Sequence, residues 1–420
     1  MRFQAHRVTN CIIFTAVRMP ALPAGYSSAR PDPMRRMLLL LALLHAALPA
    51  YLAAQTNDTR HELVRDMPTY YDQLLTRLTY PLAWPDCGMR FGRWRREARN
   101  ELMRCLQPIP PRTDFRPEVV ATERRDGYEA RRLTFQVSAW ARIPAYLLVP
   151  DGEGPHPAVL LLHDHGAKFS IGKEKMVRPF GVDDSIRTDA EEWSRKCYDG
   201  LFVGDELARR GYVVLAADAL FWGERGRKEG IRYDSQQALA ANLMQLGLTW
   251  SALITADDMA CADFLATLPE VDSRRIGCFG FSMGAYRSWM LAAATDRIRC
   301  AASLCWMGTT EALTRPGGNQ GKGGSAYAML VPGLRNAMDY PHVASIACPK
   351  PMLFFNGRRD KLFPVDGVET SYRILREVWE KRKAGDRLVA RLWEEKHFCS
   401  RAMLEEVEAF FRTYLKHAGQ

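Results

Sequence analysis

A serine between two glycines is the residue of this chain best suited to act as a nucleophile. The apolar run 276–281 ends in Gly280-Phe281-Ser282-Met283-Gly284, and a helical stretch begins at once. A serine on such a strand-to-helix turn has its hydroxyl lifted out of the sheet, and small flanking residues avoid a collision there. The turn also aims the first amides of the helix at an oxygen bound nearby. The pattern therefore predicts Ser282 as a nucleophile.

An acid and a base follow the serine, each just past the end of a predicted buried strand. The strand 351–355 leads to a turn that carries Asp360, and the strand 388–393 leads to His397. Parallel strands place such residues together at one sheet edge. His397 would accept the serine proton and return it to the leaving group, while Asp360 would orient the imidazole. Asp366, six residues after Asp360, is a rival for the role of the acid.

The chain resembles the dienelactone-hydrolase-like and acetyl-xylan-esterase-like α/β-hydrolases over about residues 115–418. The segments that carry the resemblance are 161–179, 211–225, the serine turn and 346–351 leading to Asp360. It implies an α/β fold with a mostly parallel central sheet flanked by helices, and serine esterase chemistry without a cofactor. Dienelactone hydrolases proper use a cysteine nucleophile, so Ser282 points toward ordinary carboxylic esters.

Backbone amides of two turns are predicted to bind the oxyanion. The continuous apolar run 157–162 is typical of a strand buried on both faces, and it leads into His163-Asp164-His165-Gly166-Ala167. In hydrolases of this fold, such a turn supplies one N–H and the residue after the nucleophile supplies the other. These would be the amides of Ala167 and Met283.

The same turn raises the alternative of a metal site, because two histidines and an aspartate lie close together in it. At the end of a strand the three side chains would diverge, and no cysteine or Glu-x-x-His partner is nearby. We therefore predict no metal and a structural hydrogen-bonding role for His165.

Two insertions after strand ends are predicted to shape specificity. Residues 167–200 carry three lysines, a tryptophan and a tyrosine, and residues 307–343 contain the glycine-rich run 317–324. Long loops in compact domains are commonly functional. Trp306 is a candidate for stacking on a sugar ring, with core packing as the alternative. Trp222 is expected in a loop over the pocket and is the second candidate for substrate binding.

The N-terminal region has the pattern of an export signal. Met34-Arg35-Arg36-Met37 precedes an apolar run from Leu38 to Leu48, and small residues follow before the chain turns polar. This order is typical of a secretory signal peptide. We expect translation to start at Met34, which makes 1–33 a non-native upstream extension, and cleavage near Ala54-Gln55. The protein would then be secreted or periplasmic, and an uncleaved N-terminal anchor is the alternative.

Beyond the signal peptide, the pattern predicts a helical extension and one catalytic domain. Residues 61–107 look helical, and a proline-rich linker follows, so 55–115 is interpreted as an N-terminal extension and 116–420 as the α/β-hydrolase domain. Further elements expected from the pattern are strands at 131–137, 141–149 and 212–217, a long helix over about 235–268, and helices over about 368–383 and 401–416.

The charge and the cysteine spacing argue against a nucleic-acid-binding protein and against a Cys-x-x-Cys metal site. The chain holds 58 Lys and Arg against 48 Asp and Glu; without residues 1–54, which hold six and one of these, 52 and 47 remain and the net charge is +5. This mild surplus, without a basic-aromatic stripe, argues against a nucleic-acid partner. Nine of the ten cysteines lie beyond the signal peptide, none with Cys-x-x-Cys spacing, and Cys87 and Cys105 are the best candidates for a disulfide.

The favoured function is a secreted serine esterase that acts on short acyl esters, with acetyl groups on polysaccharides as the expected substrate class. A peptidase or lactonase of the same fold is the alternative within enzymes. A non-catalytic binding protein on a hydrolase scaffold is the alternative outside them, although such a binder would not need all of Ser282, Asp360 and His397. The partner is a small-molecule or glycan ester, and no stable membrane insertion is expected.

Overall fold

Nine strands form a single sheet that carries the candidate catalytic residues. The computed structural model describes residues 69–226, 232, 235–315 and 326–416, together with Met34 and Met37. The fold below is that of the unit formed by residues 61–420. The predicted extension 1–33, the signal peptide 34–54 and the glycine-rich run 317–324 lie outside the described residues, Met34 and Met37 excepted, and stay predictions.

The sheet is mixed, with its parallel part at the centre. The strand order is β1-β2-β3-β5-β4-β6-β7-β8-β9. The pairs from β1 to β5 are antiparallel, whereas β5, β4, β6, β7, β8 and β9 are mutually parallel. The strands are β1 (Glu118–Arg125), β2 (Tyr128–Ser138), β3 (Ala141–Pro150), β4 (His156–Leu162), β5 (Val213–Ala217), β6 (Val271–Phe281), β7 (Cys300–Leu304), β8 (Met352–Gly357) and β9 (Leu388–Trp393). The predicted α/β architecture with a mostly parallel sheet is confirmed.

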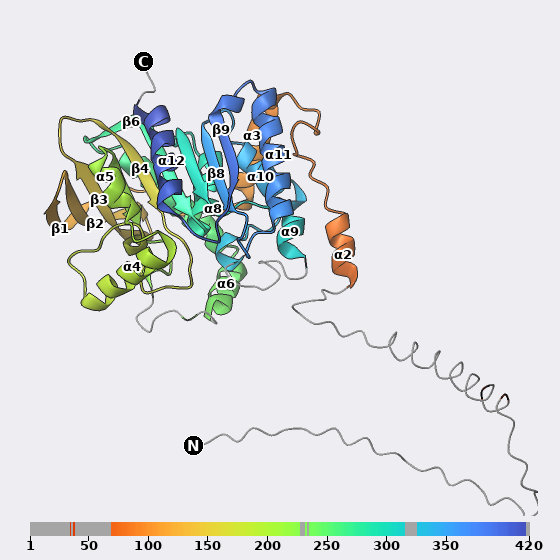
Figure 1. Ribbon diagram of the computed structural model, residues 1–420, viewed down its shortest axis with the longest axis horizontal. Helices are drawn as coiled ribbons and strands as arrows, with labels where there is room; N and C mark the ends of the chain where they lie inside the picture. Colours follow the sequence, from red (N-terminus) through yellow and green to blue (C-terminus); the bar gives the residue numbers. More distant parts are fainter. Residues whose placement is uncertain are drawn as a thin grey trace, which may run out of the picture. The chain divides into compact units, whose positions relative to one another are not determined.

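Helices cover both faces of this sheet, which explains the continuous apolar runs of its central strands. In β4, Leu160 and Leu162 belong to one hydrophobic core, and Val159 and Leu161 belong to the other. Figure 1 shows α12 in front of the strands and α8 behind them. The helices of eight or more residues are α2 (Thr69–Thr76), α3 (Phe91–Cys105), α4 (Asp184–Cys197), α6 (Gln236–Gln245), α7 (Trp250–Leu265), α8 (Met283–Ala294), α11 (Val365–Lys381) and α12 (Arg401–Phe411).

Shorter helical segments lie in the connections between these elements. They are η1 (Lys173–Lys175), α5 (Val203–Arg209), η2 (Gly223–Arg225), α9 (Thr310–Thr314), η5 (Ala326–Met329), η6 (Leu334–Asn336), α10 (Tyr340–Ser345), η7 (Gly385–Arg387) and η8 (Arg412–Lys416). Several of them lie in the two predicted insertions, which are therefore structured over much of their described length.

Two helical predictions need correction. The single long helix expected over 235–268 is two helices, α6 and α7, because the chain turns between them at Gly247, whose φ is +75°. In the described part of 61–107, the helices α2 and α3 are separated by an irregular segment that contains a cis Trp84–Pro85 bond. Helix α3 packs Trp94, Ala98 and Leu102 into the core.

The cysteines and helices of the described region carry two further findings. All nine cysteines described, Cys87 and Cys105 included, are free thiols, so the candidate disulfide is absent from this structure.

Among the described helices, no single one has both the length and the hydropathy to cross a membrane. Helices α6 and α7 meet these criteria only when taken together, and they are bent by 83° relative to one another.

Candidate active site

The serine, histidine and aspartate predicted from the sequence meet at the carboxyl edge of the parallel strands. His397 Nε2 lies 2.9 Å from Ser282 Oγ, and His397 Nδ1 lies 2.6 Å from Asp360 Oδ2. An ionised carboxylate only accepts hydrogen bonds, so Nδ1–H donates to Asp360 and Nε2 is free to accept the serine proton. The arrangement is that of a nucleophile, a general base and an orienting acid.

The backbone around Ser282 is strained in the way a nucleophilic turn requires. Ser282 has φ +56° and ψ −123°, a conformation that side-chain-bearing residues rarely adopt. A Cβ on Gly280 would lie 2.0 Å from the carbonyl oxygen of Gly284, and a Cβ on Gly284 would lie 1.8 Å from that of Leu162. Both glycines are therefore needed for the close approach of β6, α8 and β4.

The carboxylate that contacts His397 is that of Asp360, and its rival Asp366 points elsewhere. The Asp360 side chain is fully buried, and its Oδ1 accepts the amide of Leu362 at 2.8 Å. Asp366 instead forms a two-pronged ion pair with Arg315, with both N–O distances 2.8 Å. This guanidinium lowers the pKa of Asp366 and keeps its carboxylate on the surface.

Two aromatic rings pack on His397, while its own side chain remains partly exposed. Phe281 lies 4.9 Å from the imidazole, centroid to centroid, and Phe363 stacks on it at 6.0 Å with an interplanar angle of 17°. The two rings limit rotation of the imidazole, and its 23% exposed side chain gives substrate a path to the reacting atoms.

The turn after β4 is fixed by a dense set of buried hydrogen bonds. Ala167 N–H donates to His165 Nδ1 at 3.0 Å, and His165 Nε2 donates to Gln236 Oε1 at 2.8 Å. The predicted oxyanion donor Ala167 thus has an internal acceptor, which an oxyanion would have to replace or share. Met283 is the first residue of α8, so its N–H has no carbonyl one turn earlier in the helix.

The two histidines of this turn serve the fold. His163 Nε2 accepts the amide of Ala219 at 3.0 Å, and its Nδ1 faces the carbonyl of Asp164 at 2.9 Å. Together with the bonds of His165, all four ring nitrogens have partners within the protein. Sequence reasoning expected such a structural role for His165.

Two clusters of metal-type ligands occur within the described part of the chain, and each has another explanation. One is Cys305 with Asp360 and His397, which includes the acid and base of the site. The other is Glu174, Asp218 and Glu224, whose carboxylate oxygens lie 2.7, 2.9 and 2.7 Å from the Nζ of Lys173. The buried ammonium of Lys173 occupies the position that a cation would take.

Burial of the two histidines makes stability depend on pH. Desolvation lowers the pKa of His165 to about 4 and that of His163 well below its usual range. The unfolded chain takes up these protons near pH 6.5 and the folded one does not, so acidification favours unfolding. We expect the free energy of unfolding to fall between about pH 6.5 and 4, by about 1.4 kcal/mol per pH unit for each histidine.

Urea unfolding at pH 4.5–8 measures this slope, and His165→Asn should make it shallower by the contribution of one proton. Equal slopes in the variant and the wild-type protein would contradict the assignment.

The two tryptophans proposed to bind substrate belong to the core. Trp222 is fully buried and donates its indole N–H to the carbonyl of His165 at 3.1 Å. Trp306 is 1% exposed and packs against Tyr286, Tyr340 and Phe363. Neither ring has a free face for a sugar, which corrects the prediction for both and supports the core-packing alternative for Trp306.

The insertion 167–200 was predicted to shape specificity, but four of its residues are buried: Lys173, Lys175, Trp193 and Tyr198. Three of them support the turn after β4: Lys175 Nζ donates to two of its carbonyls, and Trp193 Nε1 and Tyr198 Oη donate to Asp164 Oδ2 at 3.1 and 2.6 Å. The signal for burial was the run Ile171–Val177, where apolar residues enclose Gly-Lys-Glu-Lys.

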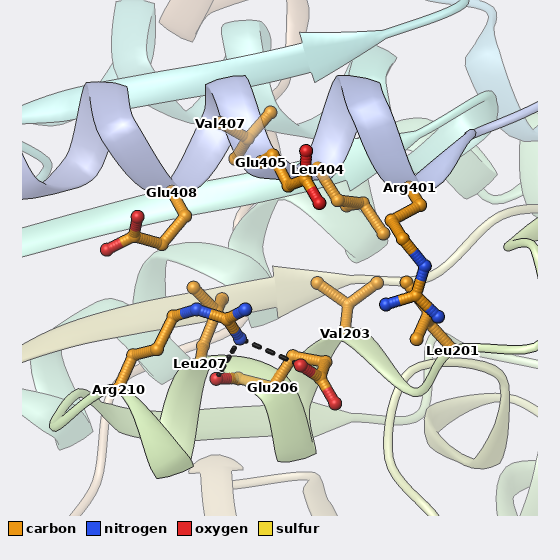
Figure 2. A pocket seen from close by; sticks show the side chains of 10 residues that line it. All are labelled: Leu201, Val203, Glu206, Leu207, Arg210, Arg401, Leu404, Glu405, Val407 and Glu408. Atoms are coloured by element: carbon orange, nitrogen blue, oxygen red, sulfur yellow. Dashed lines mark hydrogen bonds and ion pairs between the residues drawn. The ribbon is translucent and has the colours of Figure 1, made fainter.

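A hollow that none of Ser282, Asp360 and His397 lines lies between α5 and α12 (Figure 2). Its apolar residues are Leu201, Val203, Leu207, Leu404 and Val407, with charged side chains around them. Its volume of about 30 Å³ is far below that of a small-molecule site. We do not assign a ligand to it.

Comparison with known proteins agrees with this geometry. Residues 199–384 match the model of the dienelactone hydrolase family. The matched region contains Ser282 and Asp360 and ends before His397. A hydrolase of Bacillus subtilis (strain 168), YtaP, is 28% identical over 322 residues, which are 76% of this chain and 100% of YtaP.

Solved structures show the same fold at low identity. One is a protein described as an acetyl xylan esterase from Bacteroides fragilis NCTC 9343, with a TM-score of 0.61 and 18% identity over 79% of this chain and 83% of that one. Another is acetyl xylan esterase 1 from Thermoanaerobacterium sp. JW/SL YS485, with a TM-score of 0.50 and 17% identity over 78% and 99%.

Proposed function

We propose that this chain, whose residues 199–384 match the dienelactone hydrolase family, is a serine esterase acting on short-chain carboxylic esters. The observation that carries the proposal is the continuous hydrogen-bonded series from Ser282 through His397 to Asp360. A serine hydroxyl is a weak nucleophile, and such a series is what activates it.

The reaction follows from the positions of these atoms. Ser282 Oγ attacks the ester carbonyl carbon while His397 Nε2 takes the hydroxyl proton. The tetrahedral intermediate collapses to an acyl-enzyme, and the same proton passes to the departing alcohol. Water then attacks the acyl-enzyme by the same route and releases the acid. Asp360 stabilises the imidazolium at both stages.

The oxyanion of each tetrahedral intermediate needs two donors. The proposed ones are the amides of Met283 and Ala167. The Ala167 amide would exchange a neutral ring nitrogen of His165 for the oxyanion. A charged acceptor forms the stronger hydrogen bond, so this exchange favours the intermediate over the resting enzyme.

For the acyl group, acetyl is the proposed preference, and a sugar hydroxyl in a polysaccharide is the proposed alcohol. Fold neighbours described as acetyl xylan esterases support this choice. A peptidase or lactonase of the same fold uses identical residues, so the competing activities must be separated by assay.

We expect hydrolysis of p-nitrophenyl esters to fall steeply from acetyl to octanoyl, and acetate to be released from acetylated xylan. A chelator should not alter the rate, because the ring nitrogens of the nearby histidines already have protein partners. Faster turnover of the octanoyl ester, or loss of activity with EDTA that a divalent ion restores, would contradict the assignment. Faster cleavage of the matching anilide or lactone would favour the alternatives.

A further inference from the structure

A buried lysine beside the active site binds the backbone of the turn after β4. Lys175 has a fully buried side chain, and its Nζ donates to the carbonyl oxygens of Asp164 and His165, both at 2.9 Å. Asp164 Oδ1 lies 3.5 Å from the same Nζ. One ammonium therefore satisfies two consecutive buried carbonyls and is neutralised by the side chain of the same turn.

The turn that these bonds hold is conformationally unfavourable. Gly166 has φ +54° and Ala167 has φ +53°. A non-glycine residue in this region is unfavourable and persists only where its surroundings impose it. The carbonyls of Asp164 and His165 are directed at Lys175, and the two peptide planes that contain them also contain the amides of His165 and Gly166. The amide of Ala167 lies in the next peptide plane, so its direction depends on these two planes through the φ and ψ of Gly166.

We propose that Lys175 is a positioning residue that holds the turn 163–167 in the conformation that presents its amide to the oxyanion. This inference rests on the proposed serine esterase activity. A structural lysine would affect only folding, whereas a positioning lysine affects the step in which negative charge develops on the substrate oxygen.

A second donor acts on the same carbonyl. Trp222 Nε1 donates to His165 O at 3.1 Å, so that this oxygen accepts both the ammonium and the indole. The indole is neutral and its bond is weaker than that of an ammonium. Trp222 should therefore contribute in the same direction and to a smaller extent.

The chain offers a control for Lys175 and another for Trp222, each a residue of the same type that makes the same kind of bond away from the turn 163–167. Lys350 is a largely buried lysine whose Nζ donates to Ala292 O at 2.8 Å and Thr295 O at 2.6 Å, with Asp296 Oδ1 at 3.5 Å. These carbonyls lie at the C-terminal end of α8, whose N-terminal end follows Ser282. Trp250 donates its indole N–H to Leu220 O at 3.1 Å, the same bond to a different carbonyl.

The experiment compares Lys175→Met with Lys350→Met, after circular dichroism has identified the folded fraction. The probe is a fluorophosphonate, whose phosphorus Ser282 Oγ attacks while fluoride departs and His397 takes the proton. It tests the reactive serine without knowledge of the natural ester. We expect Lys175→Met to lower the maximal rate of labelling by about 10- to 100-fold with little change in probe affinity, because a misplaced donor costs this much. Lys350→Met should label at the wild-type rate.

Turnover of p-nitrophenyl acetate should show the same division, with kcat lowered in Lys175→Met and KM nearly unchanged. Trp222→Phe should lower kcat by a few-fold relative to Trp250→Phe. If Lys175→Met does not fold, this second pair decides the question.

Equal labelling of Lys175→Met and Lys350→Met, an effect confined to probe affinity, or equal kcat in Trp222→Phe and Trp250→Phe would overturn the inference. Failure of the wild-type protein to be labelled is a different result, because it would refute the reactive serine and with it the proposed function.

Discussion

Ser282→Ala should lower ester hydrolysis by about 10⁴- to 10⁶-fold while the protein remains folded. The substitution removes Oγ, so the series from Asp360 through His397 has no nucleophile to activate. The substitution should not disturb the fold of the turn, because alanine and serine have similar difficulty in adopting the φ of +56° found at this position. Initial rates with p-nitrophenyl acetate and the midpoint of urea unfolding measure the two effects separately.

Two variants control for this result. Ser288→Ala removes a buried serine of α8 that donates to Ala302 O, and activity per folded molecule should be retained. Asp360→Asn should be strongly impaired, whereas Asp366→Asn should lose only the surface ion pair with Arg315. An active Ser282→Ala protein would refute the mechanism, and greater damage from Asp366→Asn than from Asp360→Asn would refute the choice of acid.

Gly284→Ala should be among the most destabilising single substitutions in the domain, at about 4 kcal/mol or more. The new Cβ would lie 1.8 Å from the carbonyl oxygen of Leu162, and because that atom is backbone, β4 or α8 has to move. The loss should appear in the midpoint of urea unfolding and in the yield of folded protein.

Gly92→Ala is the matched control for the added methyl group. Nothing lies within 4 Å of a Cβ at Gly92 in α3, and replacing glycine by alanine in a helix favours folding by up to about 1 kcal/mol. If Gly284→Ala were as stable as the wild-type protein, the close packing of the serine turn on β4 would be incorrect.

The parts of the site that the sequence predicts are those tied to strand ends. Ser282, Asp360 and His397 each follow an apolar run, and parallel strands bring their carboxyl ends to one edge whatever the details of packing. The strand β9, for example, has the predicted bounds of 388–393. For the same reason the mixed sheet flanked by helices was predictable from the order of apolar segments.

The features that could not be predicted are those that depend on tertiary packing between side chains far apart in the sequence. Trp306 appeared free to stack on a sugar, but aromatic residues from α8, α10 and the loop after β8 enclose it. The burial of Lys173 and Lys175 was not predictable, since burial of a lysine depends on partners far away in sequence, such as Asp218 for Lys173. The outer strand β1 has largely exposed residues on both faces and therefore no alternating pattern to reveal it.

The general base of the site lies beyond the last strand at the open edge of the sheet. Among the described strands, β9 pairs with β8 alone and is half-buried along most of its length, whereas the nucleophile follows a central strand bonded on both sides. Free energies of local opening are lowest for such peripheral elements. The catalytic cycle therefore depends on an edge of the sheet, and fraying of that edge would separate imidazole from hydroxyl while the core stays intact. Catalytic competence is in this sense a less stable property of the molecule than its fold.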